Sequence, residues 1–345
     1  MSLVITIIAF IFILGVTVTI HEFGHFLFAK KAGIYVYEFS IGMGPRLFKF
    51  KRANDETDYS IRLLPIGGYV SMAGEDIQED KNVPKEKMLQ SKTWGQRFMT
   101  MVAGVMFNFL LAIVVLFIIA AFKGATMDTM YISKSKIDGL KVGDKIVEVD
   151  GHFVNNYDKL SLELAVAGSA KYDIKVKHKD NTYDYISIKP EAVYDSNKNL
   201  KGYSYPFEIT GKSEHNIITP FKYAFCKFFS TVEQMAFTVW YLITGKLSLK
   251  LLSGPVGIFT VVGTASKTGI FSVLSLLALI SINVGFINLL PIPAFDGGHI
   301  LFLIIEKIKG SKLNPKVENT IHMVFFVLLM ILMLYITLND ILRLI

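Results

Sequence analysis

Cysteine is nearly absent from this chain, which has a single one, Cys226, among 345 residues. One cysteine excludes an internal disulfide and a cysteine zinc cluster, so the redox compartment cannot be read from it. The sequence also lacks internal repeats and low-complexity tracts. Because Cys226 stands among phenylalanines, we expect it to be a packing residue.

Charge is scarce as well. Charged residues make up 19% of the chain and apolar residues 52%, whereas an ordinary soluble protein has about 25% charged residues. The net charge is +7, but the basic residues lie in loops beside apolar runs and through the middle of the chain. A nucleic-acid-binding protein would gather them on one face. The composition therefore favours a membrane protein with a basic soluble insert and no nucleic-acid partner.

Four stretches with few or no charges are long enough to cross a bilayer, which takes roughly 20 apolar residues of helix. We expect transmembrane segments within 1–33, 97–123, 267–306 and 318–345. The first lacks a basic leader region and a small-residue cleavage site, so we expect a retained helix rather than a signal peptide.

The third segment is too long for one straight span, and prolines and glycines interrupt it around Asp296, its only formal charge between Lys267 and Glu306. A broken helix at membrane depth is tolerated only where protein or a cavity satisfies its backbone. An ionisable residue at such a break marks a functional site. We therefore single out Asp296.

Lysine and arginine in short loops set the orientation of a membrane protein. The loop from Lys30 to Arg97 carries twelve of them, and the short loop 307–317 carries Lys307, Lys309, Lys312 and Lys316, so we expect both loops to be cytoplasmic. Both termini and the region 124–266 then face the outside of the membrane. The long region 124–266 is also rich in lysine, but long domains are translocated largely regardless of their charge.

The first apolar segment runs directly into an H-E-x-x-H pattern, with His21, Glu22 and His25. On a helix, residues four apart share a face, so both imidazoles can bind one zinc ion while Glu22 handles the proton of a water molecule. The pattern alone is weak evidence for a metal site. Its place at the end of an uncharged helix strengthens it, because burying ionisable groups there is costly. The alternative is that these residues only mark the membrane border.

A catalytic zinc needs a third protein ligand and an open position. Asp296 is our preferred third ligand, and the alternative role is a helix N-cap at the start of the second half-helix. His299 is a less favoured ligand. Asn283 and Asn288 lie on the same broken segment and could bind the substrate backbone or an oxyanion, or else form hydrogen bonds between helices.

With these motifs in place, the chain resembles the site-2 proteases of the bacterial RseP type over nearly its whole length. The resemblance rests on the H-E-x-x-H pattern and on four further stretches in this order: 39–45 (FSIGMGP), 64–70 (LPIGGYV), 253–258 (SGPVGI) and 288–298 (NLLPIPAFDGG). Phe295 stands where family members often have leucine.

The resemblance implies a zinc ion bound by His21, His25 and Asp296, with Glu22 catalytic. It implies that Asn283 and Asn288 help to bind the substrate. It further implies regulated intramembrane proteolysis in a bacterial cytoplasmic membrane. The expected substrates are single-pass membrane proteins already cut by an upstream site-1 protease, such as anti-sigma factors, or remnant signal peptides.

Residues 34–96 are expected to form a β-hairpin loop followed by a charged connector. The resemblance suggests that the hairpin dips into the membrane beside the zinc, where its edge could pair with an extended substrate strand. Gly67 and Gly68 are therefore candidate substrate-binding residues.

Residues 124–192 alternate in a strand-like manner and resemble one PDZ domain, with Asp150 and Gly151 in a tight hairpin turn. The domain either binds peptide or filters substrates by size. Residues 193–266 are expected to form a linker and amphipathic helices at the outer membrane surface.

The predicted fold is thus a polytopic α-helical membrane protein with four transmembrane segments, the third of them broken, a membrane-associated β-hairpin and one extracytoplasmic PDZ-like α+β domain. The predicted function is that of an intramembrane zinc metalloendopeptidase. Two alternatives are a membrane transporter, since broken helices also mark transport sites, and an inactive peptide-binding scaffold.

Overall fold

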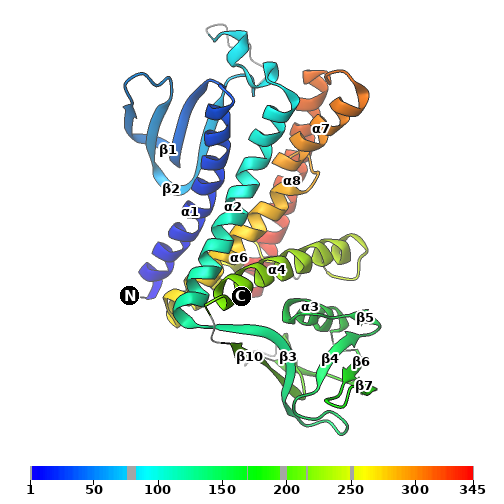
Figure 1. The fold of residues 1–345 in the computed structure, drawn as a ribbon. Helices are drawn as coiled ribbons and strands as arrows, with labels where there is room; N and C mark the ends of the chain where they lie inside the picture. Colours follow the sequence, from blue (N-terminus) through cyan, green and yellow to red (C-terminus); the bar gives the residue numbers. More distant parts are fainter. Residues whose placement is uncertain are drawn as a thin grey trace. The chain divides into compact units, whose positions relative to one another are not determined.

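A computed structural model of the protein describes residues 2–75, 83–168, 170–194, 200–214, 217–248 and 252–344. The chain forms two units, one made of Met1–Leu116 with Lys250–Ile345 and the other of Phe117–Leu249. Figure 1 shows their elements, and we describe each unit by itself.

Among the described residues, four helices are long and apolar enough to cross a membrane, and they lie in the four expected stretches. They are α1 (Ser2–Lys31), α2 (Trp94–Lys123), α6 (Ile270–Leu289) and α8 (Pro315–Leu344). Even the shortest, α6 with 20 residues, is about 30 Å long at 1.5 Å per residue, which matches a bilayer core. The prediction of a membrane protein with four apolar helices is confirmed.

Helix α8 shows why these helices need lipid. Many of its large apolar side chains are exposed on the protein, among them Met323, Phe326, Leu328, Leu334 and Leu338. A soluble protein rarely exposes so continuous an apolar surface. A hydrocarbon environment removes this surface from water.

The expected break in the third apolar stretch separates two helices. Helix α6 ends at Leu289, and α7 (Asp296–Lys309) begins after six irregular residues. A further helix, α5 (Pro255–Thr268), precedes α6 and is separated from it by Gly269, whose φ of 125° requires glycine. The 20 residues of α6 are long enough to cross the membrane without α7.

Two glycines allow the irregular segment to pack tightly on the first turn of α7. A Cβ atom at Gly297 would lie 2.0 Å from the Leu290 carbonyl oxygen, and one at Gly298 would lie 2.5 Å from the Pro293 Cα atom. Neither backbone neighbour can move aside easily. The two glycines therefore fix the position of the residue just before them, Asp296.

Small and hydroxylated residues bring α1 close to α5 and α6. Thr17 lies within hydrogen-bonding distance of Ser281 on α6 (3.3 Å), and a Cβ atom at Gly263 of α5 would lie 3.3 Å from Thr6. Such residues drive helix association in membranes, where apolar side chains gain little by leaving lipid.

The C-terminal part of α8 also caps α5. The buried carboxylate of Asp340 accepts hydrogen bonds from the backbone N–H groups of Gly254 and Gly257, both at 2.8 Å. These N–H groups belong to the first turn of α5, where helices leave donors without intrahelical partners and favour negative charge. A side chain from the end of the chain thus completes the N-terminus of a distant helix.

The strands expected in 34–71 are present as an antiparallel pair, β1 (Val36–Lys51) and β2 (Asp58–Met72), which lies along α1 (Figure 1). Both strands bend, so that residues 39–41 of β1 lie between residues 68–70 and residues 59–61 of β2. One edge of this small sheet is therefore formed by 68–72. Two short 3₁₀ helices, Lys85–Lys87 and Leu89–Ser91, follow in the connector.

A buried carboxylate, Glu38, holds the pair together. It accepts hydrogen bonds from Ser60, Tyr69, Arg46 and Arg62, and the two arginines also form ion pairs with it. Burial alone would raise the pKa of Glu38, but these donors together outweigh it and lower the pKa to about 2. The carboxylate is therefore ionised across the physiological pH range.

The second unit is an α+β domain. Its main sheet has the strand order β10-β3-β4-β6-β7, with β5 paired to β4, and β8 and β9 form a separate pair. The strands are β3 (Ala125–Ser135), β4 (Lys145–Val149), β5 (His152–Phe153), β6 (Tyr172–Lys177), β7 (Tyr183–Ile188), β8 (Glu191–Tyr194), β9 (Leu200–Ser204) and β10 (Phe207–Glu214).

The core of this domain is formed by alternating strand residues and by α3 (Tyr157–Ala167). Ile146, Leu160 and Ile174 are almost fully buried in it. The expected hairpin turn is confirmed, because Asp150 and Gly151 between β4 and β5 both have positive φ, 47° and 79°, as a type I′ turn requires.

A long helix, α4 (Thr219–Ile243), ends the second unit. The expectation that Cys226 packs in a core is wrong, because this α4 residue is exposed. Its neighbours Phe225 and Phe229 are exposed too, whereas Phe228 is buried, so Cys226 lies on the exposed side of α4.

We predict that Glu38→Gln lowers the melting temperature of the detergent-solubilised protein near pH 7, because it replaces charge-assisted hydrogen bonds worth about 1.5–3 kcal/mol each. A carboxylate whose folded pKa is lowered stabilises the fold above its unfolded pKa, about 4.3, and this contribution is lost as pH falls toward about 2. The difference between wild type and variant should therefore shrink over that window in thermal unfolding curves.

The matched control is Glu208→Gln, which breaks an exposed ion pair with Lys134 and should change little at any pH. A difference for Glu38→Gln that persists unchanged down to pH 2 would contradict the role assigned to the Glu38 carboxylate.

Candidate metal centre

Helix α1 presents two buried histidines on one face. His21 and His25 are one helical turn apart, and their rings lie edge to face with centroids 4.8 Å apart. Their Nε2 atoms point to the same place and are 3.2 Å apart. The H-E-x-x-H spacing therefore places both imidazoles on one face of the helix, as expected.

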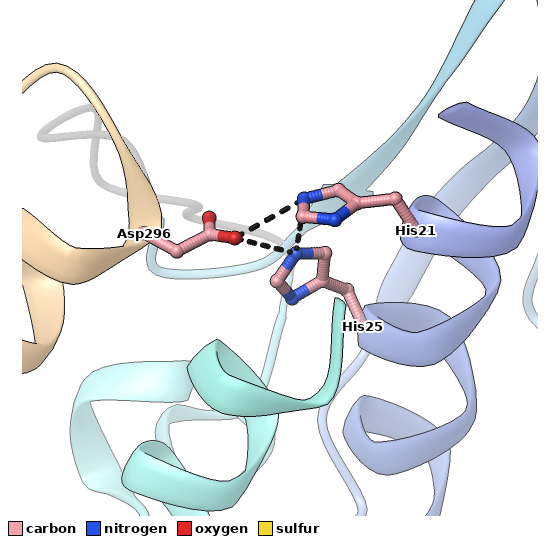
Figure 2. Close-up of side chains that lie close together, drawn as sticks. All are labelled: His21, His25 and Asp296. Carbon is pink, nitrogen blue, oxygen red and sulfur yellow. Dashed lines mark hydrogen bonds and ion pairs between the residues drawn. The ribbon is translucent and has the colours of Figure 1, made fainter. Parts of the chain in front are cut away.

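Asp296, the first residue of α7, completes a cluster with them (Figure 2). Its Oδ2 atom lies 3.1 Å from Nε2 of His21 and 3.3 Å from Nε2 of His25. The alternative role as an N-cap does not hold, because Phe295 occupies the N-cap position and no side chain caps the helix there. The carboxylate instead faces α1.

Each of the three atoms that meet can donate a lone pair. Nδ1 of His25 lies 2.8 Å from the backbone carbonyl of Thr100, which can only accept, so Nδ1 carries the proton and Nε2 of the neutral ring is an acceptor. Asp296 Oδ2 is buried and lacks a hydrogen-bond donor among the described residues. Buried acceptors so close together repel one another unless a positive charge lies between them.

A zinc ion fits these distances. With bonds of about 2.0–2.1 Å in a tetrahedral site, two zinc ligands lie about 3.3 Å apart. The three observed separations, 3.1, 3.2 and 3.3 Å, match this edge length. Two imidazoles and one carboxylate are a common donor set of catalytic zinc sites that keep a fourth position open.

Helix α2 approaches the histidines at Gly104. A Cβ atom at this glycine would lie 2.2 Å from His25 Nε2 and 2.8 Å from His21 Cε1. On the opposite helix, a Cβ atom at Gly24 would lie 2.5 Å from the Ala103 carbonyl oxygen. The two glycines let α1 and α2 touch, and any side chain at position 104 would fill the space in which the three donor atoms meet.

Asn108, fully buried on α2, lies against the other nitrogen of His21. Its Nδ2 atom is 3.3 Å from His21 Nδ1, and its Oδ1 atom is buried without a partner among the residues described. For Nε2 of His21 to donate a lone pair, Nδ1 must carry the proton. Nδ1 then needs an acceptor, which the Asn108 amide provides when its oxygen and nitrogen exchange places. This exchange leaves the shape of the Asn108 side chain unchanged. In that orientation Asn108 orients His21 as the Thr100 carbonyl orients His25.

Glu22 lies beside this cluster and is fixed by β2. Its carboxylate accepts a hydrogen bond from the backbone N–H of Val70 at 3.1 Å. A Cβ atom at Gly68 would be 3.9 Å from Glu22 Cγ, so the edge 68–72 of the hairpin and the glutamate are in contact. The sequence alone could not show which backbone group would hold Glu22.

The other candidate residues lie outside the cluster. Asn283 and Asn288 are half-buried on α6 and form no side-chain hydrogen bond with the described part of the chain. Gly67 and Gly68 lie on β2, and Gly67 has a φ of 91°. His299, the less favoured ligand, groups with Glu318 and His322 and not with the α1 histidines.

Sequence reasoning missed Asn108, Gly104 and the Thr100 carbonyl. A usable signal existed for Asn108, which is a strongly polar residue deep within the apolar stretch 97–123. No signal existed for the other two, because an apolar helix contains many glycines and carbonyls, and only helix packing selects among them.

The chain is similar to known proteins over nearly its whole length. Residues 9–332 match the model of peptidase family M50. The chain is 36% identical over 338 residues to a protein of Fusobacterium nucleatum described as a zinc metalloprotease, covering 96% of this chain and 97% of that protein. It is also 31% identical to the regulator of sigma-W protease RasP of Bacillus subtilis, over 422 residues that cover 98% of this chain and 99% of RasP.

We predict that Asn108→Leu weakens zinc binding by about 10- to 100-fold, which is typical for the loss of a group that orients a metal-binding histidine. Asn108→Asp, which keeps an acceptor for His21 Nδ1, should retain most of the affinity. Competition with a chromophoric chelator in detergent measures both. Asn288→Leu is the matched control and should leave the affinity unchanged; equal affinities for Asn108→Leu and wild type would show that Asn108 does not orient His21.

Proposed function

Because the chain belongs to peptidase family M50, and is a zinc metalloprotease of the intramembrane site-2 type, we propose that His21, His25 and Asp296 bind its zinc and that Glu22 is its catalytic base. The main observation behind the assignment is that three buried donor atoms lie as far apart as the ligands of a tetrahedral zinc ion do. The residues come from two helices far apart in the sequence and share no other evident role.

Zinc in such a site supplies a Lewis acid for the peptide carbonyl and makes water a nucleophile at neutral pH. Glu22 accepts the proton of the attacking water and passes it to the leaving amine. The Val70 N–H holds one Glu22 oxygen, which supports this role because a general base must be fixed within hydrogen-bond reach of the proton it takes.

The substrate is proposed to bind as an extended strand along the edge 68–72 of β2. A helical peptide bond is shielded by its neighbours, so a transmembrane substrate has to unwind before its carbonyl can be attacked. The free backbone groups of a sheet edge stabilise the unwound segment by strand addition. Contact between Gly68 and Glu22 places this edge beside the catalytic base, which supports a substrate-binding role for Gly67 and Gly68.

Asn283 and Asn288 are proposed to bind the substrate backbone. Support comes from their lack of partners within the described residues, since buried or membrane-embedded amides normally find a hydrogen bond. Interhelical hydrogen bonding, the alternative role, has no observation in its favour.

The proposed substrates are single-pass membrane proteins that an upstream site-1 protease has already shortened, such as anti-sigma factors, or remnant signal peptides. The name of the Bacillus subtilis relative, a regulator of sigma-W protease, supports the first class. The exposed apolar surface of α8 supports a bilayer as the place of cleavage.

For the topology, we propose a bacterial cytoplasmic membrane with both termini and the second unit outside and with the loop 34–96 inside. The second unit is proposed to be PDZ-like, which its single short helix packed on a small antiparallel sheet supports. Helix α4 is proposed to lie at the outer surface, supported by its exposed Phe221, Phe225, Phe229 and Trp240.

Glu22→Gln tests the catalytic assignment. Removing the base should lower kcat for a model transmembrane substrate by at least about 100-fold while leaving one zinc bound at this cluster. Asp296→Ala should lose the zinc at this cluster and, with it, cleavage. Normal cleavage by Glu22→Gln would overturn the mechanism, and absence of cleavage in the wild type with every substrate offered would favour the inactive scaffold. The transporter alternative has no support in the family comparison.

Gly67→Ala tests the substrate edge. A side chain at a φ of 91° costs about 1–2 kcal/mol, so the local backbone should shift and kcat/KM should fall roughly tenfold with the zinc content unchanged. Gly151→Ala imposes the same kind of strain at a φ of 79° in the second unit and serves as the control. Equal kcat/KM for the two variants would argue against substrate binding at the β2 edge.

A further inference from the structure

A second cluster of metal-ligating side chains lies between α7 and α8, apart from the proposed catalytic centre. His299 of α7 and Glu318 and His322 of α8 each offer one ligand atom, and these atoms all lie within 4.8 Å of one another. His299 Nδ1 is 3.7 Å from a Glu318 carboxylate oxygen, and the two histidine rings stack with centroids 4.2 Å apart. None of the three residues has a role in the proposed cleavage.

One nitrogen in this cluster has no partner. His322 Nε2 is buried, and no group in the described residues forms a hydrogen bond with it. Buried side-chain nitrogens without a hydrogen bond are rare in proteins, and binding of an ion satisfies such a nitrogen. Its position beside a carboxylate and a second imidazole favours a cation over a water molecule alone.

Two of the three side chains of the cluster, His299 and Glu318, line a cavity of about 250 Å³. The cavity is also lined by Glu75, Arg97, Glu306 and Lys312. Arg97 is already paired with Glu306 through two contacts of 2.9 Å, so the two neutralise each other and Glu318 is left to the histidines. The cavity gives an ion a path to the cluster and room for water ligands.

We propose that His299, Glu318 and His322 form a second binding site for a divalent transition-metal ion, with zinc as the cation best suited to two imidazoles and one carboxylate. Loading requires a modest adjustment, because ligands of one tetrahedral ion lie about 3.3 Å apart. His299 and Glu318 have 37% and 27% of their side chains exposed, so the adjustment falls on side chains that are only partly buried.

The ion would act on the position of Asp296. It would join α8 to α7, and Asp296 is the first residue of α7. The backbone of Pro293, in the irregular segment before Asp296, faces the His322 ring. A metal ion bound here would therefore stiffen the segment that carries the third catalytic ligand without touching the catalytic centre itself.

The test is metal content of the full-length protein purified in detergent and equilibrated with zinc, measured by inductively coupled plasma mass spectrometry. We expect two zinc ions per wild-type chain and one in Glu318→Gln, which keeps the shape of the side chain and removes its charge. His322→Gln should also hold one. Glu306→Gln is the matched control, since it removes a carboxylate from the same cavity outside the cluster, and it should keep two.

A His21→Ala/His25→Ala variant measures zinc binding at the second site without altering the residues of that site. It keeps the proposal testable if the other variants fail to fold. It should retain one zinc and should melt at a higher temperature with zinc than without it. One zinc per wild-type chain that disappears in this variant would overturn the proposal, as would two zinc ions in Glu318→Gln. Neither result overturns the catalytic assignment, which the loss of cleavage in Glu22→Gln tests separately.

Discussion

Three acceptor atoms from two distant parts of the chain meet in a buried place, between 3.1 and 3.3 Å apart. Such an arrangement is unfavourable in the absence of a cation, because buried lone pairs repel each other and each has given up its water. A divalent cation converts this cost into binding. The rest of the first unit can be understood as the structure that holds these atoms in place before the ion arrives.

Close contacts at small residues provide that rigidity. Gly24 and Gly104 let α1 and α2 touch at the histidines, while Gly297 and Gly298 lock the turn that carries Asp296. In lipid there is little hydrophobic driving force between helices, so contacts of this kind, together with buried hydrogen bonds, determine how helices associate. A side chain at any of these glycines would displace backbone or side-chain atoms next to a residue of the proposed metal site.

The hairpin contributes the catalytic geometry that a metal site alone lacks. The Val70 N–H holds Glu22, and the same strand forms the edge of the small sheet along which the substrate is proposed to bind. The Glu38 cluster inside the hairpin fixes its two bent strands with a carboxylate that remains ionised at physiological pH. One small sheet thereby links the general base to the proposed path of the substrate, and its stability and the catalytic arrangement depend on each other.

Local composition and spacings of a few residues were enough to predict the four apolar helices, the strands of 34–71, the turn at Asp150 and Gly151, and the histidine pair. From the sequence, Asp296 could be either a metal ligand or the N-cap of a helix, and the ligand role was only preferred. The structure excludes the N-cap role, because Phe295 is the N-cap residue of α7. Tertiary structure alone selected Asn108, Gly104 and the Thr100 carbonyl, and moved His299 to a separate cluster. The physical reason is that contacts between helices depend on their rotation and separation, which a pattern along one chain does not encode.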